Sequence, residues 1–203
     1  LSHQKLKLFY LMKILLEKTD EEHTITVPEM IAELGKLGIS AERKSVYDDL
    51  EYLKLFGLDV CSRKTRTHDY FIGSREFELP ELKLPVDSVQ ASKFITHKKS
   101  MELISKIEKL TSEANAKKLH RQVFVTNRVK TVNETIYYNV DKIHDAIAAN
   151  KQITFKYYDL DVNRKKVYRK NGDRYTESPV ALTWDDENYY LITYKEKYDN
   201  YTH

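Results

Sequence analysis

Apolar residues recur at helical spacing in three segments near the start of the chain. The segments are KLKLFYLMKILLEKT over 5–19, TVPEMIAELGKLG over 26–38 and SAERKSVYDDLEYL over 40–53. Apolar side chains three and four positions apart line one face of a helix, so each segment predicts an amphipathic α-helix. Short polar connections separate the three segments. The pattern therefore predicts a helix-turn-helix arrangement.

Residues at the ends of these segments fit helix boundaries. Thr26 is placed to cap the second helix, and Pro28 falls in its first turn, where proline is tolerated. Gly35 or Gly38 can close the same helix. Ser40 is the predicted N-cap of the third helix, which we expect to end near Phe56 and Gly57.

A strand pattern follows the third helix. The stretch LDVCSRKTRTHDYFIG, over 58–73, has apolar ends around a tip rich in Arg, Lys and Thr, and it predicts a β-hairpin. Three helices followed by a two-stranded wing with a basic tip is the element order of a winged helix. We therefore predict a winged helix-turn-helix domain over residues 1–75.

The third helix leaves its polar side free for a partner, because Val46, Leu50 and Leu53 occupy the apolar side. In DNA-binding domains of this kind the early turns of that helix enter the major groove, and the wing contacts phosphates. Arg43 is suited to bind the edge of a guanine, and Ser45 and Tyr47 are suited to contact a phosphate or a thymine methyl group. The predicted DNA-contacting residues are Ser40, Arg43, Lys44, Ser45, Tyr47, Arg63, Lys64 and Arg66.

Two alternatives fit the same residues. Acidic and basic side chains balance over 41–70, so the helix and hairpin could form an ordinary solvated surface. A winged helix can also bind protein instead of DNA.

The middle of the chain, residues 76–135, is predicted to be a helical linker. REFELPELKLPVDSV, over 75–89, carries two prolines and predicts an extended connector, with a helix starting at Asp87. KKSMELISKIEKLTSEANAKKL, over 98–119, predicts one long helix. Its apolar stripe comprises Leu103, Ile107, Leu110 and Ala114. This helix packs one face on a neighbouring element, helps to hold DNA or a partner through its basic residues, or contributes to a dimer.

The last part, residues 136–203, changes from helical to strand periodicity. NVDKIHDAIAANKQ predicts a short helix, and ITFKYY and ENYYLITY alternate as strands do. Asn171-Gly172 predicts a hairpin turn between strands. Short antiparallel strands after a helix indicate a small barrel or a curled sheet.

Composition excludes several classes of protein. The net charge of +3 is too small to indicate a nucleic-acid binder by itself, and no run of 18 apolar residues predicts a membrane span. Cys61 is the only cysteine, so no intramolecular disulfide is possible, which fits a reducing cytoplasmic location. The motifs GxxxxGK[ST], GxSxG, HExxH and CxxC are absent, and we expect no enzyme activity, no cofactor and no metal site.

The sequence resembles WYL-domain proteins in DENYYLITY, preceded by SPVALTW and ITFKYYD. Tyr189-Tyr190-Leu191 stands where that family has Trp-Tyr-Leu, with Tyr replacing Trp at the first position. SAERKSVYDDLEYLKLFG resembles the DeoR-like recognition helix that often precedes this domain. The resemblance implies an α+β protein with a winged helix, a helical linker and a WYL domain built on an Sm-like, SH3-type barrel. We expect that barrel to continue beyond His203.

The resemblance also implies a function, that of a bacterial transcription regulator. Its partners would be double-stranded DNA, a nucleotide or single-stranded nucleic-acid effector, and a second copy of the chain in a homodimer. By position, the ligand-binding candidates are Tyr157, Arg174, Ser178, Trp184, Tyr189 and Tyr190. Aromatic faces stack bases and Arg pairs with phosphate, although strand positions also bury every second side chain. The alternative function is a nucleic-acid or protein interaction module without promoter specificity.

Overall fold

The computed structural model describes residues 4–64, 67–120, 130–131, 133, 135–163, 165–196 and 199–202. The chain forms two compact units. Unit 1 comprises residues 1–91 and 98–128, and unit 2 comprises residues 92–97 and 129–203. Most of the predicted linker thus belongs to unit 1, and two short pieces of it, Ser92–His97 and 129–135, belong to unit 2.

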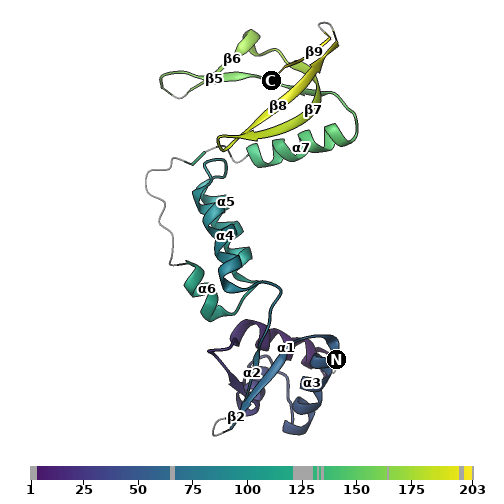
Figure 1. Cartoon of the computed structure of the whole chain (residues 1–203), viewed down its shortest axis with the longest axis vertical. Helices are drawn as coiled ribbons and strands as arrows, with labels where there is room; N and C mark the ends of the chain where they lie inside the picture. Colours follow the sequence, from purple (N-terminus) through teal and green to yellow (C-terminus); the bar gives the residue numbers. More distant parts are fainter. Residues whose placement is uncertain are drawn as a thin grey trace. The chain divides into compact units, whose positions relative to one another are not determined.

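Unit 1 begins with three helices and a small antiparallel sheet (Figure 1). The elements in chain order are α1 (Gln4–Lys18), β1 (Ile25–Thr26), α2 (Val27–Lys36), α3 (Arg43–Phe56), β2 (Val60–Lys64) and β3 (His68–Ile72). The sheet has the order β1-β3-β2. The three predicted helices and the predicted hairpin are confirmed. Only β1 was missed, because two residues are too short for a periodic pattern.

The helix ends follow the predicted chemistry with one exception. Thr26 caps α2 through a capping box, in which its Oγ1 accepts from the Glu29 amide at 3.4 Å and its own amide donates to Glu29 Oε2 at 2.7 Å. Gly38, at φ 73°, follows the end of α2. The prediction that Ser40 caps α3 is wrong. The N-cap is Glu42, and Ser40 lies two residues too early to reach the first turn.

The three helices enclose the hydrophobic core of this part of unit 1. Its members come from all three helices and from the strands, and the predicted apolar stripe of α3 is confirmed. The buried residues are Leu11, Ile14, Leu15, Ile25, Val27, Met30, Leu34, Ile39, Val46, Leu50, Leu53, Val60 and Ile72.

A buried lysine joins α1 to α3. Lys7 is 5% exposed, and its Nζ lies 2.8 Å from Asp49 Oδ2. The same ammonium group donates to Ser45 Oγ. A buried ammonium group is tolerated only with such partners, so this contact fixes the orientation of α3 on α1.

The middle helices correct two predictions. The prolines do not prevent a helix: α4 spans Leu79–Ala91 and contains Pro85 in its interior. Leu82 and Val86 are buried four residues apart on one face of α4. Their burial outweighs the backbone hydrogen bond that Pro85 cannot make. The predicted connector over 75–89 and helix start at Asp87 are therefore wrong.

The predicted long helix is two helices, α5 (His97–Glu108) and α6 (Glu113–His120). The chain breaks there because Ser112 caps α6, with its Oγ accepting from the Asn115 amide at 3.2 Å. The buried positions are Ser100, Ile104 and Leu119, and Leu110 of the predicted stripe is exposed.

Unit 2 contains one long helix and two antiparallel sheets (Figure 1). The elements are α7 (Ile136–Ala148), β4 (Ile153–Phe155), β5 (Tyr158–Leu160), β6 (Lys166–Tyr168), the 3-10 turn η1 (Arg169–Gly172), β7 (Tyr175–Asp185), β8 (Asn188–Lys195) and β9 (Asn200–Thr202). One sheet has the order β4-β7-β8-β9, and β5 pairs with β6. Helix α7 packs against β7.

The sheets of unit 2 differ from the predicted barrel and hairpin turn in two ways. The described strands form no closed barrel, because β4 and β9 are the two edges of the four-stranded sheet. Asn171-Gly172 is no hairpin turn, since it lies in η1 and connects strands of different sheets. Asn171 does have the left-handed backbone that makes this pair common in turns, at φ 49°.

None of the described helices combines the length and the hydrophobicity that a bilayer crossing requires.

The Lys7–Asp49 pair gives a testable prediction for stability. Asp49→Ala leaves a buried ammonium group without its counter-ion, and we expect it to destabilise unit 1 by about 3 kcal/mol. Glu17→Ala is the matched control, because it breaks an exposed ion pair on α1, the helix that carries Lys7. Glu17 pairs there with Lys13 at 3.7 Å. Its expected cost is below about 1 kcal/mol. Urea unfolding followed by circular dichroism measures both, and equal losses would contradict the assigned role of Lys7.

Candidate functional site

The predicted DNA-contacting residues of α3 occupy its first turns. Arg43 and Lys44 are exposed there. The Arg43 Nε donates to the Tyr47 hydroxyl at 3.1 Å, and its guanidinium carbon lies 5.7 Å from the centre of the Tyr47 ring. The Tyr47 ring in turn lies 6.5 Å from the ring of Tyr70 on β3. Arg43 is thus held along the helix by a tyrosine that the sheet supports.

Ser45 lies on a different side of α3 from Arg43 and Lys44. Its hydroxyl accepts from Lys7, and it is only partly exposed. Its interaction in this structure anchors the helix on α1. Ser40 is exposed in the connection before α3.

The predicted wing residues lie on β2. Arg63 donates to the Glu21 carbonyl oxygen at 3.4 Å, and its guanidinium carbon lies 5.3 Å from the Phe71 ring centre. Lys64 is exposed at the end of β2. Arg66 lies outside the described residues.

The end of α1 is a polar junction that the sequence did not reveal. Thr19 is fully buried, and its Oγ1 donates to Leu15 O at 2.7 Å and accepts from the Ile72 amide at 3.1 Å. Arg75 donates from Nη2 to Leu16 O and to Thr19 O, both at 2.7 Å. These bonds satisfy the carbonyl groups that a helix leaves free at its C-terminus.

Asp20 extends this junction to the connection between α5 and α6. Its Oδ2 accepts from the Ser112 hydroxyl, and its Oδ1 accepts from the amides of Glu22 and His23 at 3.0 and 2.9 Å. The His23 ring Nδ1 lies 2.8 Å from the same oxygen. Burial alone would raise the pKa of Asp20, but these hydrogen bonds outweigh it and hold the pKa below its ordinary 3.8.

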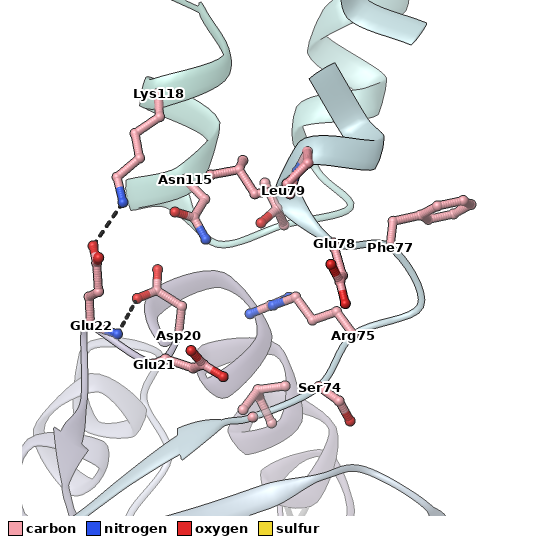
Figure 2. A pocket seen from close by; sticks show the side chains of 14 residues that line it. Asp20, Glu21, Glu22, Ser74, Arg75, Phe77, Glu78, Leu79, Asn115 and Lys118 are labelled. Atoms are coloured by element: carbon pink, nitrogen blue, oxygen red, sulfur yellow. Dashed lines mark hydrogen bonds and ion pairs between the residues drawn. The ribbon is translucent and has the colours of Figure 1, made fainter. Parts of the chain in front are cut away.

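A hollow of about 500 Å³ lies beside this junction (Figure 2). Two of its charged side chains, Lys118 of α6 and Glu22, pair at 2.8 Å across its edge. The Arg75 side chain extends toward Asp20 (Figure 2). Among the residues that the structure describes, no three His, Cys, Asp or Glu side chains gather as metal ligands would. We therefore interpret this hollow as part of the packing between α6 and the end of α1.

Two of the predicted ligand-binding residues of unit 2 form an aromatic cluster. Trp184 and Tyr189 are directly opposite each other on β7 and β8, with ring centres 4.6 Å apart. Phe94 completes the cluster, at 5.7 Å from Trp184 and 4.9 Å from Tyr189. Sequence analysis missed Phe94, because it lies ninety positions away along the chain.

Phe94 belongs to a short segment that is bound to this hairpin end. The Lys93 amide donates to Glu187 Oε2 at 3.3 Å, and the Lys93 carbonyl accepts from the Thr131 amide at 2.9 Å. The Lys130 ammonium group donates to Ser92 O at 3.1 Å. The segment Ser92–His97 therefore covers one side of the Trp184–Tyr189 pair.

The other predicted ligand-binding residues do not join this cluster. Tyr190 points to the opposite face of β8 from Tyr189, since successive strand residues alternate, and it lines a separate hollow of about 470 Å³ with Ile192 and Tyr201. Arg174 contacts Thr154 Oγ1 at 3.5 Å, and Ser178 accepts from Gln152 at 3.2 Å.

Tyr157 lies beside another set of aromatic rings. The Arg169 guanidinium carbon lies 4.4 Å from its ring centre, and the Tyr175 ring lies at 6.1 Å. Arg169 also donates to both carboxylate oxygens of Asp159, at 2.7 and 3.1 Å, and these bonds lower the pKa of Asp159. The residues around Tyr157 that sequence analysis missed are Lys156, Tyr158, Lys166, Tyr168, Arg169, Lys170 and Tyr175. The clustering of Lys, Arg and Tyr over 155–158 and 165–170 was the available signal.

The pKa of Asp20 predicts a specific pH dependence. A carboxyl group whose pKa is lowered by folding stabilises the folded state at every pH above its ordinary pKa. That contribution is lost as the pH falls through the pKa of the folded state. Wild-type unit 1 should therefore exceed Asp20→Asn in unfolding free energy at pH 7, and this difference should shrink below about pH 4. Asp48→Asn, at an exposed position of α3, is the control and should show a constant difference. A constant difference for Asp20→Asn would contradict the assignment.

The aromatic cluster predicts a spectroscopic change, because Trp184 is the only tryptophan of the chain. Phe94→Ala removes the ring that covers it, so the emission should shift to longer wavelength and quenching by iodide should increase. Tyr138→Ala, at an exposed ring of α7, is the matched control and should leave the emission unchanged. An unchanged spectrum in Phe94→Ala would mean that the segment does not cover Trp184 in solution.

Comparison with known proteins gives one family match. No curated protein matches this chain. The model of the WYL domain family matches residues 138–203, which contain most of α7 and all of the described strands of unit 2. WYL domains occur in regulators and in other nucleic-acid-binding proteins. Residues 138–203 of this chain are a WYL domain.

Proposed function

We propose that this protein is a transcription regulator that binds promoter DNA through a winged helix in unit 1 and senses a nucleic-acid or nucleotide-type ligand through its WYL domain. The observation that carries the proposal is the start of α3. Arg43 and Lys44 are exposed on its first turns, while the Lys7–Asp49 pair fixes the opposite side of the helix on α1.

The element order of unit 1 supports this proposal. Helices α1, α2 and α3 are followed by the β2–β3 hairpin, and β1 adds a third strand to that sheet. In DNA-binding domains with this order the third helix enters the major groove and the hairpin contacts the backbone. Arg63 and Lys64 on β2 supply positive charge for those contacts.

The Arg43–Tyr47 contact supports a reading role for Arg43. A guanidinium group held by a hydrogen bond and by a ring loses less conformational freedom when it binds a base edge. Its two free amino groups can still donate to a guanine. Lys44, without such support, suits a phosphate.

Dimer formation remains part of the proposal. Regulators that read two half-sites bind as two-fold dimers, and we propose that this chain does so. Effector binding would then change DNA affinity only if the effector binds the two states of the dimer differently.

Fluorescence anisotropy of the full-length protein tests the proposal. The probes are a duplex from the region upstream of its own gene, a scrambled duplex and a single strand, each in a salt series. We expect tight, sequence-selective duplex binding. Arg43→Ala should weaken duplex binding about ten- to a hundredfold and relax the sequence preference at one base pair of the duplex. Duplex affinity should fall steeply as the salt concentration rises, because several phosphate contacts are made.

Lys54→Ala is the matched control, because Lys54 lies on the last turn of the same helix and pairs with Glu51 at 2.7 Å. It should leave duplex affinity nearly unchanged. Equal affinity for the upstream and scrambled duplexes would favour a non-specific interaction module. No binding to either duplex would favour a winged helix that binds protein, and either result would overturn promoter recognition.

A further inference from the structure

The hairpin of β5 and β6 presents an aromatic and basic face that none of the comparisons assigns. Tyr158 is directly opposite Tyr168, and Leu160 is opposite Lys166, so these side chains share one face of the hairpin. Lys156 lies on the same face, because its Nζ is 5.7 Å from the Tyr168 ring centre. We call Lys156, Tyr158, Lys166 and Tyr168 the hairpin face.

Each ring of the hairpin face carries a cation. The Lys166 ammonium group lies 4.6 Å from the Tyr158 ring centre, in addition to the Lys156–Tyr168 contact. On the reverse side, Arg169 and Lys170 lie over Tyr157 and Tyr175 at 4.4 and 4.2 Å. Significant cation–ring contacts occur about once per 70–80 residues in proteins. This segment has four between residues 156 and 175, which is far above that frequency.

The charge of the hairpin face is positive. Asp159 points to the reverse side, where Arg169 pairs with both of its oxygens. Helix α7 packs on β7. The Tyr168 ring remains 45% exposed. A two-stranded hairpin gains little stability from a ring that stays in water. The exposed Tyr168 and the partly exposed Tyr158, both beside lysines, therefore point to a ligand with flat rings and negative charge.

The left-handed turn η1 lies against this face. Lys170, Asn171 and Gly172 all have positive φ, at 48°, 49° and 88°. A Cβ atom at Gly172 would lie 4.0 Å from Lys156 Nζ and from the Tyr168 Cβ. Backbone conformations of this kind are costly for Lys and are found most often where function requires them.

We propose that the hairpin face binds single-stranded nucleic acid, with bases on Tyr158 and Tyr168 and phosphates on Lys156 and Lys166. The two rings are 5.8 Å apart and inclined by 68°, so each takes one base of an unstacked strand, whereas a duplex keeps its base faces covered. This inference rests on the nucleic-acid effector in the proposed function, and it assigns the effector to a surface apart from Trp184, Tyr189 and Tyr190.

The test measures anisotropy of the full-length protein with labelled oligodeoxythymidylate and oligouridylate of about 12 nucleotides. Wild-type protein should bind one or both, and the stronger of the two identifies the effector as DNA or RNA. Tyr158→Ala with Tyr168→Ala should weaken binding at least tenfold. The double variant of Lys156→Gln with Lys166→Gln keeps the rings. In this variant the slope of log affinity against log salt concentration should fall in magnitude by about 1.4. Tyr138→Ala is the matched control and should bind as wild type does.

Several outcomes would overturn the inference. The inference fails if the wild-type protein does not bind single strands, or if both double variants bind them as the wild type does. It also fails if Tyr157→Ala is the variant that loses binding while the hairpin-face variants keep it. Equal competition by inorganic polyphosphate would also overturn it, because that polyanion has no bases to stack.

The promoter duplex measurement is independent of this test. Arg43→Ala should keep single-strand binding, and the hairpin variants should keep duplex binding. Loss of duplex binding alone would therefore overturn the promoter proposal and leave this inference standing.

Discussion

The turn at the end of α1 carries the interactions on which the arrangement of unit 1 depends. Thr19, Asp20 and the last carbonyl groups of α1 bind Ile72, Arg75 and Ser112, partners that are 53 to 92 positions away along the chain. These groups are buried or half-buried, so losing one partner would leave another polar group unsatisfied. The turn therefore links the sheet, the segment after β3 and the α5–α6 connection, and these parts depend on one another for their polar contacts. It explains why α6 belongs to unit 1 and not to a separate linker.

The orientation of α3 depends on a second polar contact, between Lys7, Ser45 and Asp49. The apolar residues Val46, Leu50 and Leu53 hold the helix on the core, but apolar packing alone permits small rotations. A buried ammonium group with two specific partners permits far fewer, because any rotation would separate the charges. The contact thereby determines which residues of α3 face outward. Arg43 and Lys44 are available to a partner because Ser45 is engaged on the other side.

Unit 2 separates its aromatic residues into sets with different chemistry. At the end of the β7–β8 hairpin, Phe94 covers Trp184 and Tyr189, and the three rings pack edge to face. On the β5–β6 hairpin and beside it, each of four tyrosine rings lies under a lysine or arginine, namely Tyr158 and Tyr168 of the hairpin and the neighbouring Tyr157 and Tyr175. The first set is connected through Ser92–His97 to the sequence that enters α5.

The sequence by itself determined the elements whose side chains repeat with a clear period: α1, α2, α3, α7 and β8, together with the β2–β3 hairpin. It also identified the WYL domain and the exposed position of Arg43, since periodicity and short motifs are local properties. The tertiary structure decided the rest. Burial of Leu82 and Val86 made a helix of a segment with two prolines, and the Ser112–Asp20 contact broke a predicted helix in two. The alternation of strand residues separated Tyr189 from Tyr190, and β-pairing placed Tyr158 against Tyr168. These outcomes depend on partners far along the chain, and a local pattern carries no record of which distant residue will be buried against it.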